Sequence, residues 1–123
     1  MSSLEHHALA IEEKGDVTVA RFKIARLLKE GTVEIIGEQL FALVDEQGRR
    51  RLVLDFGQVE RLYSVMLGKI AALQQKVQAA GGRLALCQLN PDVYEVFMAL
   101  NLDKAIEIYD SEQQALQAVT AAN

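Results

Sequence analysis

The sequence has little of the side-chain chemistry on which most active sites depend. Its one cysteine, Cys87, can form neither a disulfide within the chain nor a cysteine-rich zinc site. Its two histidines, His6 and His7, are adjacent near the N-terminus, where they are a weak metal signal and are not expected to assist a nucleophile. These scarcities argue against disulfide-stabilised, zinc-binding and hydrolytic functions. We expect no metal site, no cofactor and no catalytic activity.

Long apolar runs and an excess of positive charge are absent as well. No run of about 18 apolar residues occurs, so no membrane span is predicted. The 13 Lys and Arg against 17 Asp and Glu give a net charge of -4, which argues against nucleic acid as the main partner. The one basic run, residues 49–51, is interpreted as a solvated turn. Residues 1–9 hold neither an apolar signal segment nor a basic leader, and with the lone cysteine this predicts a reducing, cytoplasmic location.

The eight glycines and one proline are few and act as punctuation between apolar segments. A length of 123 residues predicts one domain. We expect an N-terminal tail at residues 1–8 and the domain at 9–120, without linkers or internal repeats. Hydrophobic residues make up 50% of the chain and charged residues 24%, which is typical of a folded globular domain rather than a disordered chain.

Apolar periodicity predicts strands and helices in alternation. Two strands, at 9–13 and 17–22, flank a tight turn at Gly15-Asp16. Further strands are predicted at 51–56, 83–87 and 105–109. Helices are predicted at 32–47, at 64–80, and after residues 90 and 110. The order β-β-α-β-α-β-α-β-α predicts an α/β fold, a single domain with a mixed β-sheet and packed α-helices.

Polar residues predict where the helices begin. Thr32 and Ser64 are expected to cap the first two helices, and Asn90, which precedes a proline, the third. Asp110 is expected to cap the last helix, with Gln113 completing a capping box. The third helix is expected to place four apolar side chains on one side: Val93, Val96, Phe97 and Leu100.

The end of the predicted strand at 51–56 is where a phosphate site would be expected. Only Gly57 follows it, too few glycines for a phosphate-binding loop. Asp55 lies where receiver domains hold their phospho-accepting aspartate. The partners of such a site are out of place, because Glu12 and Glu13 precede a hairpin turn and Lys104 precedes its strand. We therefore expect Asp55 to accept backbone N–H bonds at the strand end.

A family resemblance begins in the same region. Residues 52–69 read LVLDFGQVERLYSVMLGK. This segment resembles the STAS domain of anti-sigma factor antagonists and sulfate transporters, in which a buried strand ends in Asp and Asp-Ser-Ser/Thr-Gly-Leu-Gly then opens a helix. Residues 79–84, 89–93 and 102–111 also resemble STAS segments, in the same order. The resemblance covers about residues 9–118.

The resemblance implies a non-enzymatic regulatory protein similar to an anti-sigma factor antagonist. In that group a partner that is both serine kinase and anti-sigma factor phosphorylates one serine at a helix start. The unphosphorylated form binds the partner, and the phosphorylated form is released. The aligned residue here is Ser64. A helix start suits this role because its free N–H groups and partial positive charge tolerate a phosphate.

Around Ser64 the sequence differs from the family pattern. Tyr63 replaces an aspartate, Val65 a Ser/Thr and Met66 a glycine, while Lys29 lies where an acidic residue is common. The expected partner surface spans residues 63–69, with the loops 23–31 and 89–92 alongside. Its expected contacts are Tyr63, Val65, Met66, Lys69, Lys29 and Asn90. In the alternative interpretation the chain is a constitutive, phosphorylation-independent assembly module, Ser64 is only a cap, and Tyr63 and Met66 are fixed contacts.

Overall fold

The computed structural model describes residues 8–27 and 29–120. Within these ranges the chain forms twelve elements, in the order β1 (Leu9–Lys14), β2 (Val17–Phe22), β3 (Arg26–Leu27), α2 (Glu30–Asp45), β4 (Arg51–Asp55), β5 (Arg61–Leu62), α3 (Ser64–Ala79), β6 (Arg83–Cys87), α4 (Pro91–Ala99), the short 3₁₀ helix η1 (Leu102–Lys104), β7 (Glu107–Tyr109) and α5 (Glu112–Thr120). His6 and His7, together with most of the predicted tail, lie outside the described residues.

Five of the strands form one mixed sheet, in the order β1-β2-β4-β6-β7. β1 is antiparallel to β2, and every other neighbouring pair is parallel. The β1–β2 turn requires Gly15, which adopts φ +63°. The predicted mixed α/β fold is therefore confirmed. β3 and β5 were not predicted, and they form a separate two-stranded parallel ribbon.

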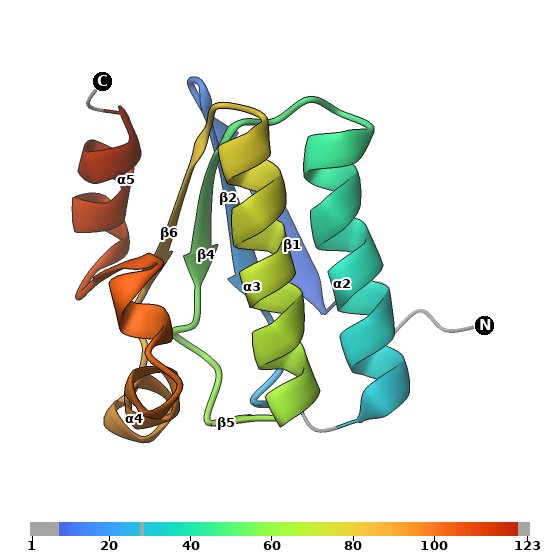
Figure 1. The fold of residues 1–123 in the computed structure, drawn as a ribbon, viewed down its shortest axis with the longest axis vertical. Helices are drawn as coiled ribbons and strands as arrows, with labels where there is room; N and C mark the ends of the chain where they lie inside the picture. Colours follow the sequence, from blue (N-terminus) through green and yellow to red (C-terminus); the bar gives the residue numbers. More distant parts are fainter. Residues whose placement is uncertain (1–7, 28, 121–123) are drawn as a thin grey trace.

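The sheet separates two unequal helical layers. α2 and α3 lie side by side on one face, and α5 covers the other (Figure 1). The strands alternate accordingly, so Leu52 and Leu54 belong to the core under α2 and α3, while Val53 belongs to a smaller cluster with Ala115 and Val119 of α5. Both faces of β4 and β6 are thus buried, as is usual for near-continuous apolar strands in a parallel sheet.

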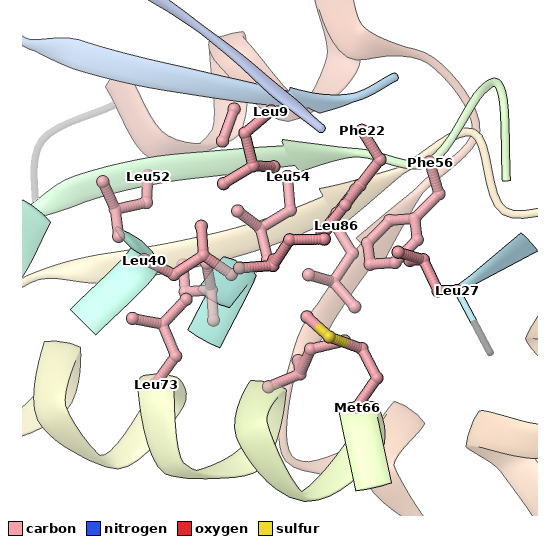
Figure 2. Close-up of a cluster of buried hydrophobic side chains, with 14 of the residues drawn as sticks. Leu9, Phe22, Leu27, Leu40, Leu52, Leu54, Phe56, Met66, Leu73 and Leu86 are labelled. Carbon is pink, nitrogen blue, oxygen red and sulfur yellow. The ribbon is translucent and has the colours of Figure 1, made fainter. Parts of the chain in front are cut away.

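The larger core continues to the end of the sheet near the start of α3. The rings of Phe22 and Phe56 lie 4.6 Å apart, and Phe56 meets Phe97 of α4 edge-on at 6.2 Å. Leu27 of the ribbon and Met66 of α3 point into the same cluster (Figure 2). The aromatic residues therefore join the sheet, the ribbon and α4 into one packed unit beneath the start of α3.

Two predicted helix starts are wrong. α2 begins at Glu30 with Lys29 as its N-cap, so Thr32 is a buried residue inside the helix. α5 begins at Glu112, because the Ser111 hydroxyl accepts a 3.1 Å bond from the N–H of Gln114. The capping box is therefore one residue later than predicted.

Two features near the C-terminal half also differ from expectation. The predicted strand at 105–109 shortens to β7 because η1 and a turn occupy the residues before it. α4 buries Val93 and Phe97 but leaves Val96 39% and Leu100 55% exposed. No helix in the described ranges is long and apolar enough to cross a membrane.

Candidate partner-binding site

The start of α3 is held in place by the small β3–β5 ribbon. β5 runs directly into the helix, and its Arg61 and Leu62 pair in register with Arg26 and Leu27 of β3. The ribbon and the start of α3 lie at the same edge of the molecule, below the main sheet in Figure 1. Hydrogen bonds from the N–H groups of residues 60 and 61 to the carbonyl of Ala25 extend the pairing. Two segments distant in sequence therefore fix where the helix begins.

Ser64 is the first residue of α3, and its side chain is exposed. The N-cap position belongs to Tyr63, whose backbone is extended at φ -72° and ψ 138° and whose side chain makes no capping bond. The prediction that Ser64 caps the helix is therefore wrong by one position. In residues 8–27 and 29–120 no group forms a hydrogen bond with the Ser64 hydroxyl. The hydroxyl is therefore accessible, and no described group holds it in place.

The electrostatic environment at this helix start suits an anion. The first turn of α3 contains no acidic residue, so the partial positive charge of the helix N-terminus is not neutralised within the helix. The N–H of Met66 already donates to the Tyr63 carbonyl at 2.9 Å. A phosphate on Ser64 would thus sit at a terminus whose dipole favours it.

Met66 was expected to contact a partner, and its position in the structure shows that this expectation is wrong. Its side chain is 0% exposed and packs in the core, whereas the preceding Val65 is 38% exposed. Met66 precedes the buried Ile70 by four positions, so helix geometry places both on the face toward the sheet. Met66 therefore supports the helix from beneath and offers nothing to a partner, while Val65 is the apolar group at the surface.

The remaining expected contact residues differ in how far their side chains are buried or bonded within the chain. Tyr63 is half-buried and packs against the core, and Lys29 is exposed at the start of α2. Lys69 is half-buried, and its Nζ donates to Glu34 of α2 at 3.0 Å. The Lys69 stem lies over Gly37, where an added Cβ would come within 3.0 Å of it. Lys69 thus joins α3 to α2, whereas Lys29 is available at the surface.

Asn90 is confirmed as the N-cap of α4. Its Oδ1 accepts from the N–H of Val93 at 2.8 Å, and its Nδ2 donates to the carbonyls of Val59 and Glu60 at 3.1 and 3.3 Å. The amide therefore ties α4 to the segment that leads into β5. Asn90 positions the elements around the site, and its polar groups are engaged within the chain.

A groove beside the helix start was not predicted. It encloses about 180 Å³ between β5 and α4, and Arg61, Leu62 and Val96 are among its lining residues. We call it the β5–α4 groove. It exists because α4 turns Val96 toward β5 instead of burying it. The sequence holds a signal in retrospect, since Val96 and Leu100 lie at the margin of the buried stripe set by Val93 and Phe97.

Asp55 is confirmed as a residue that satisfies backbone at the end of β4. Its Oδ1 accepts from the N–H of Gly57 at 2.8 Å, and Gln88 donates to its Oδ2 at 3.0 Å. Burial raises the pKa of Asp55, and the neighbouring carboxyl group of Glu112 raises it further. A buried carboxyl held by Gly57 and Gln88 links the segments that follow β4 and β6, and this arrangement does not favour a phospho-accepting role.

Cys87 lies beside this cluster and is buried on the α5 face of the sheet. Burial raises the pKa of its thiol to about 12, with the charge of Asp55 a smaller cause. The thiolate is the reactive form of cysteine, so a thiol with this pKa is inert at neutral pH. Cys87 therefore serves as a core residue.

Comparison with known proteins identifies the architecture. The STAS domain model matches residues 8–115. A Thermotoga neapolitana protein named as an anti-sigma factor antagonist homologue is 34% identical over 73 residues, which is 59% of this chain and 65% of that protein. The anti-sigma F factor antagonist of Paenibacillus polymyxa is 26% identical over 108 residues, covering 88% of this chain and 92% of its own.

A solved structure gives the same result. The crystal structure of an anti-sigma factor antagonist from Mycobacterium paratuberculosis superposes with a TM-score of 0.80 at 25% identity, covering 91% of this chain and 92% of that one. The family match spans nearly the whole described chain. The chain therefore belongs to the STAS domain family and has an anti-sigma factor antagonist-like fold.

Proposed function

We propose that this chain is a non-enzymatic regulatory module that binds an anti-sigma factor with serine kinase activity, and that phosphorylation of Ser64 releases it. The observation that supports the proposal most directly is the exposed Ser64 hydroxyl at the start of α3, which forms no hydrogen bond with any residue of 8–27 and 29–120. Named anti-sigma factor antagonists among the relatives support the class of partner. This function takes place in the cytoplasm, where sigma factors act.

The Ser64 surface consists of Ser64, Val65, the ribbon arginines Arg26 and Arg61, and Lys29. Val65 supplies an exposed apolar contact, and the arginines lie opposite each other in the β3–β5 register. All three basic side chains are exposed, although the whole chain has a net charge of -4. Such a basic rim around an apolar centre favours a partner with a complementary acidic surface.

Phosphorylation would change this surface in two ways. A phosphate adds a charge of about -1.5 to -2 at neutral pH next to the apolar Val65, and that charge must be desolvated when a partner docks. It would also compete with the acidic groups of the partner for Arg26 and Arg61. Because the phosphate is favourable at the helix N-terminus, the module itself stays folded while its affinity falls.

The test is a comparison of Ser64→Asp with Ser64→Ala. The anti-sigma factor captured by the wild-type chain from its own cells is purified, and its dissociation constant is measured for each variant. A switch predicts that Ser64→Asp weakens binding by about 1–3 kcal/mol while Ser64→Ala binds like wild type. Aspartate is favourable in a first helical turn, so lost binding would not reflect a damaged helix.

The constitutive alternative predicts a different result. If the chain is a phosphorylation-independent assembly module, Ser64→Asp and Ser64→Ala bind equally, and Val65→Asp alone disrupts the complex. Equal binding by both Ser64 variants would contradict the switch while leaving the docking surface in place. Capture of no anti-sigma factor by the wild-type chain would contradict the proposed partner class.

A further inference from the structure

A basic pocket lies at the end of the sheet that is opposite the end near Ser64. It encloses about 540 Å³ among three turns: the β1–β2 hairpin, the α2–β4 connection and the α3–β6 connection. All three turns lie at the top of Figure 1, whereas β5 and the start of α3 lie at the bottom. Among its lining residues are Arg49, Arg50, Arg51 and Arg83. We call it the arginine pocket, and it is separate from the Ser64 surface.

The arginine pocket concentrates positive charge on an acidic chain. Four of the seven arginines in the sequence line it, and Asp16 is the one acidic residue among its described lining residues. The whole chain has a net charge of -4. Local concentration of one sign of charge in a concave site raises the local concentration of counter-ions. The distribution therefore favours a small anion at this edge.

Neighbouring groups hold some of these arginines in place. Arg51 Nη1 donates to the carbonyl of Thr120 at the end of α5, at 3.2 Å. Arg83 forms a 2.7 Å ion pair with Glu107. Arg49 lies 3.2 Å from Glu13 in a pair that is exposed on both sides. Because a guanidinium has five N–H donors, Arg49 and Arg51 retain donors beyond these bonds.

Arg50 differs from the other three. It is exposed, and no residue of the described ranges forms a hydrogen bond or ion pair with its guanidinium. Its backbone is fixed against β6, because a Cβ at Gly82 would collide with the Arg50 carbonyl. The pocket thus places an unengaged guanidinium on a rigid segment beside arginines that are already oriented.

The turns that form the rim leave the pocket accessible. Gly15, Gly48 and Gly81 adopt φ of +63°, +68° and +78°, and a Cβ at each would meet no atom within 4 Å. Glycine at these positions is required by the backbone conformation. The absence of side chains there lets a ligand approach the arginines from solvent.

We propose that the arginine pocket binds a small multivalent phosphate anion. The planar guanidinium fork matches phosphate oxygens and forms charge-assisted, bidentate hydrogen bonds. The volume falls within the range of about 300–1,000 Å³ usual for small-ligand sites. Among its described lining residues there is no aromatic side chain on which a base could stack, so recognition rests on the phosphate group alone.

The test is a titration of the full-length chain with inorganic pyrophosphate at constant ionic strength. Two-dimensional NMR records the chemical shifts of the backbone amide groups during the titration. Saturable shifts are expected for residues 48–51 and 81–83 and not for residues 61–66. Inorganic phosphate should bind the same residues more weakly, because it carries less charge. Chloride at matched ionic strength should produce no saturable shift.

Matched variants separate a site from general charge attraction. Arg50→Gln should weaken pyrophosphate binding about tenfold, as expected for loss of a charge-assisted hydrogen bond. Lys104→Gln removes an exposed positive charge that does not line the pocket and should bind like wild type. The proposal is overturned if pyrophosphate produces no saturable shift, if Arg50→Gln binds as well as wild type, or if both variants weaken binding equally.

Discussion

The backbone N–H of Tyr63 donates a 2.6 Å hydrogen bond to the carbonyl of Leu27. This bond continues the β3–β5 pairing by one residue and sets the extended backbone of Tyr63 immediately before α3. Leu27 itself is fully buried under Phe56, so the bond links the helix start to the core (Figure 2). Ser64 therefore follows a stretch of backbone that is hydrogen-bonded to the ribbon and, through Leu27, to the core.

Met66 and Val65 are expected to contribute very differently to the stability of the fold. Met66→Ala removes a fully buried side chain and should lower the free energy of unfolding by about 2–5 kcal/mol. Val65→Ala, at a position 38% exposed, should change it by less than about 0.5 kcal/mol. Urea denaturation measures both. Equal losses in the two variants would show that the assignment of faces at the start of α3 is wrong.

Gly82 is expected to resist any side chain. An added Cβ would overlap the Arg50 carbonyl, and the two residues immediately precede the paired strands β4 and β6. Gly82→Ala should therefore destabilise the fold and shift its thermal midpoint downward. Gly68→Ala is the control, since a Cβ there meets nothing within 4 Å and alanine favours a helix by about 1 kcal/mol. A Gly82→Ala variant as stable as wild type would contradict this close packing.

The carboxyl groups of Glu112 and Asp55 are expected to change the stability of the fold with pH in opposite directions. Hydrogen bonding to Arg21 lowers the pKa of Glu112 from 4.5 to about 2, so its contribution is present above pH 4.5 and is lost as the pH falls through about 2. Burial raises the pKa of Asp55 above 3.8, so its contribution is present below that pH and is lost as the pH rises through the folded pKa.

Two substitutions separate these contributions. Glu112→Gln should remove the rise of stability between about pH 2 and 4.5. Asp55→Asn keeps an N–H donor for Glu112 but cannot ionise, so the decline above pH 3.8 should disappear. Denaturant unfolding at a series of pH values measures each slope. Unchanged profiles in both variants would contradict the pairing of these carboxyl groups.

Asn90 is expected to affect both the stability of the fold and the local opening of β5. Asn90→Ala removes the side-chain cap of α4 and should cost about 1 kcal/mol, within the usual range for caps. It also removes the bonds to the carbonyls of Val59 and Glu60, so hydrogen exchange should accelerate in β5. Ser111→Ala removes the cap of α5 and is the matched control. Its exchange in β5 should match wild type, and acceleration there in both variants would count against a local role for Asn90.

Periodicity in the sequence predicted the main sheet and helices because long apolar segments repeat regularly. It missed β3 and β5, since two residues are too few to show a period. The expectation that Met66 contacts a partner was wrong, because Met66 and Ile70 lie four residues apart and share the helix face toward the core. The ribbon that presents Ser64 depends on contacts between distant segments, which a linear pattern does not contain.

The family resemblance supplied what periodicity could not. Nothing in the local pattern distinguishes Ser64 from an ordinary cap, and the structure shows that Tyr63 takes the cap position instead. The arginine pocket was missed for a related reason. Residues 49–51 are interpretable as a solvated turn in the sequence, and only folding brings Arg83 and the hairpin beside them.

If Ser64 is the regulated residue of this surface, it carries phosphate in the cell. Phosphopeptide mass spectrometry of the chain purified from its own cells, in growth and under stress, tests this directly. Phosphate on Ser64 is expected in at least one condition, with the captured anti-sigma factor absent from the phosphorylated fraction. Ser64 unmodified in every condition while the chain still binds and releases that partner would contradict it.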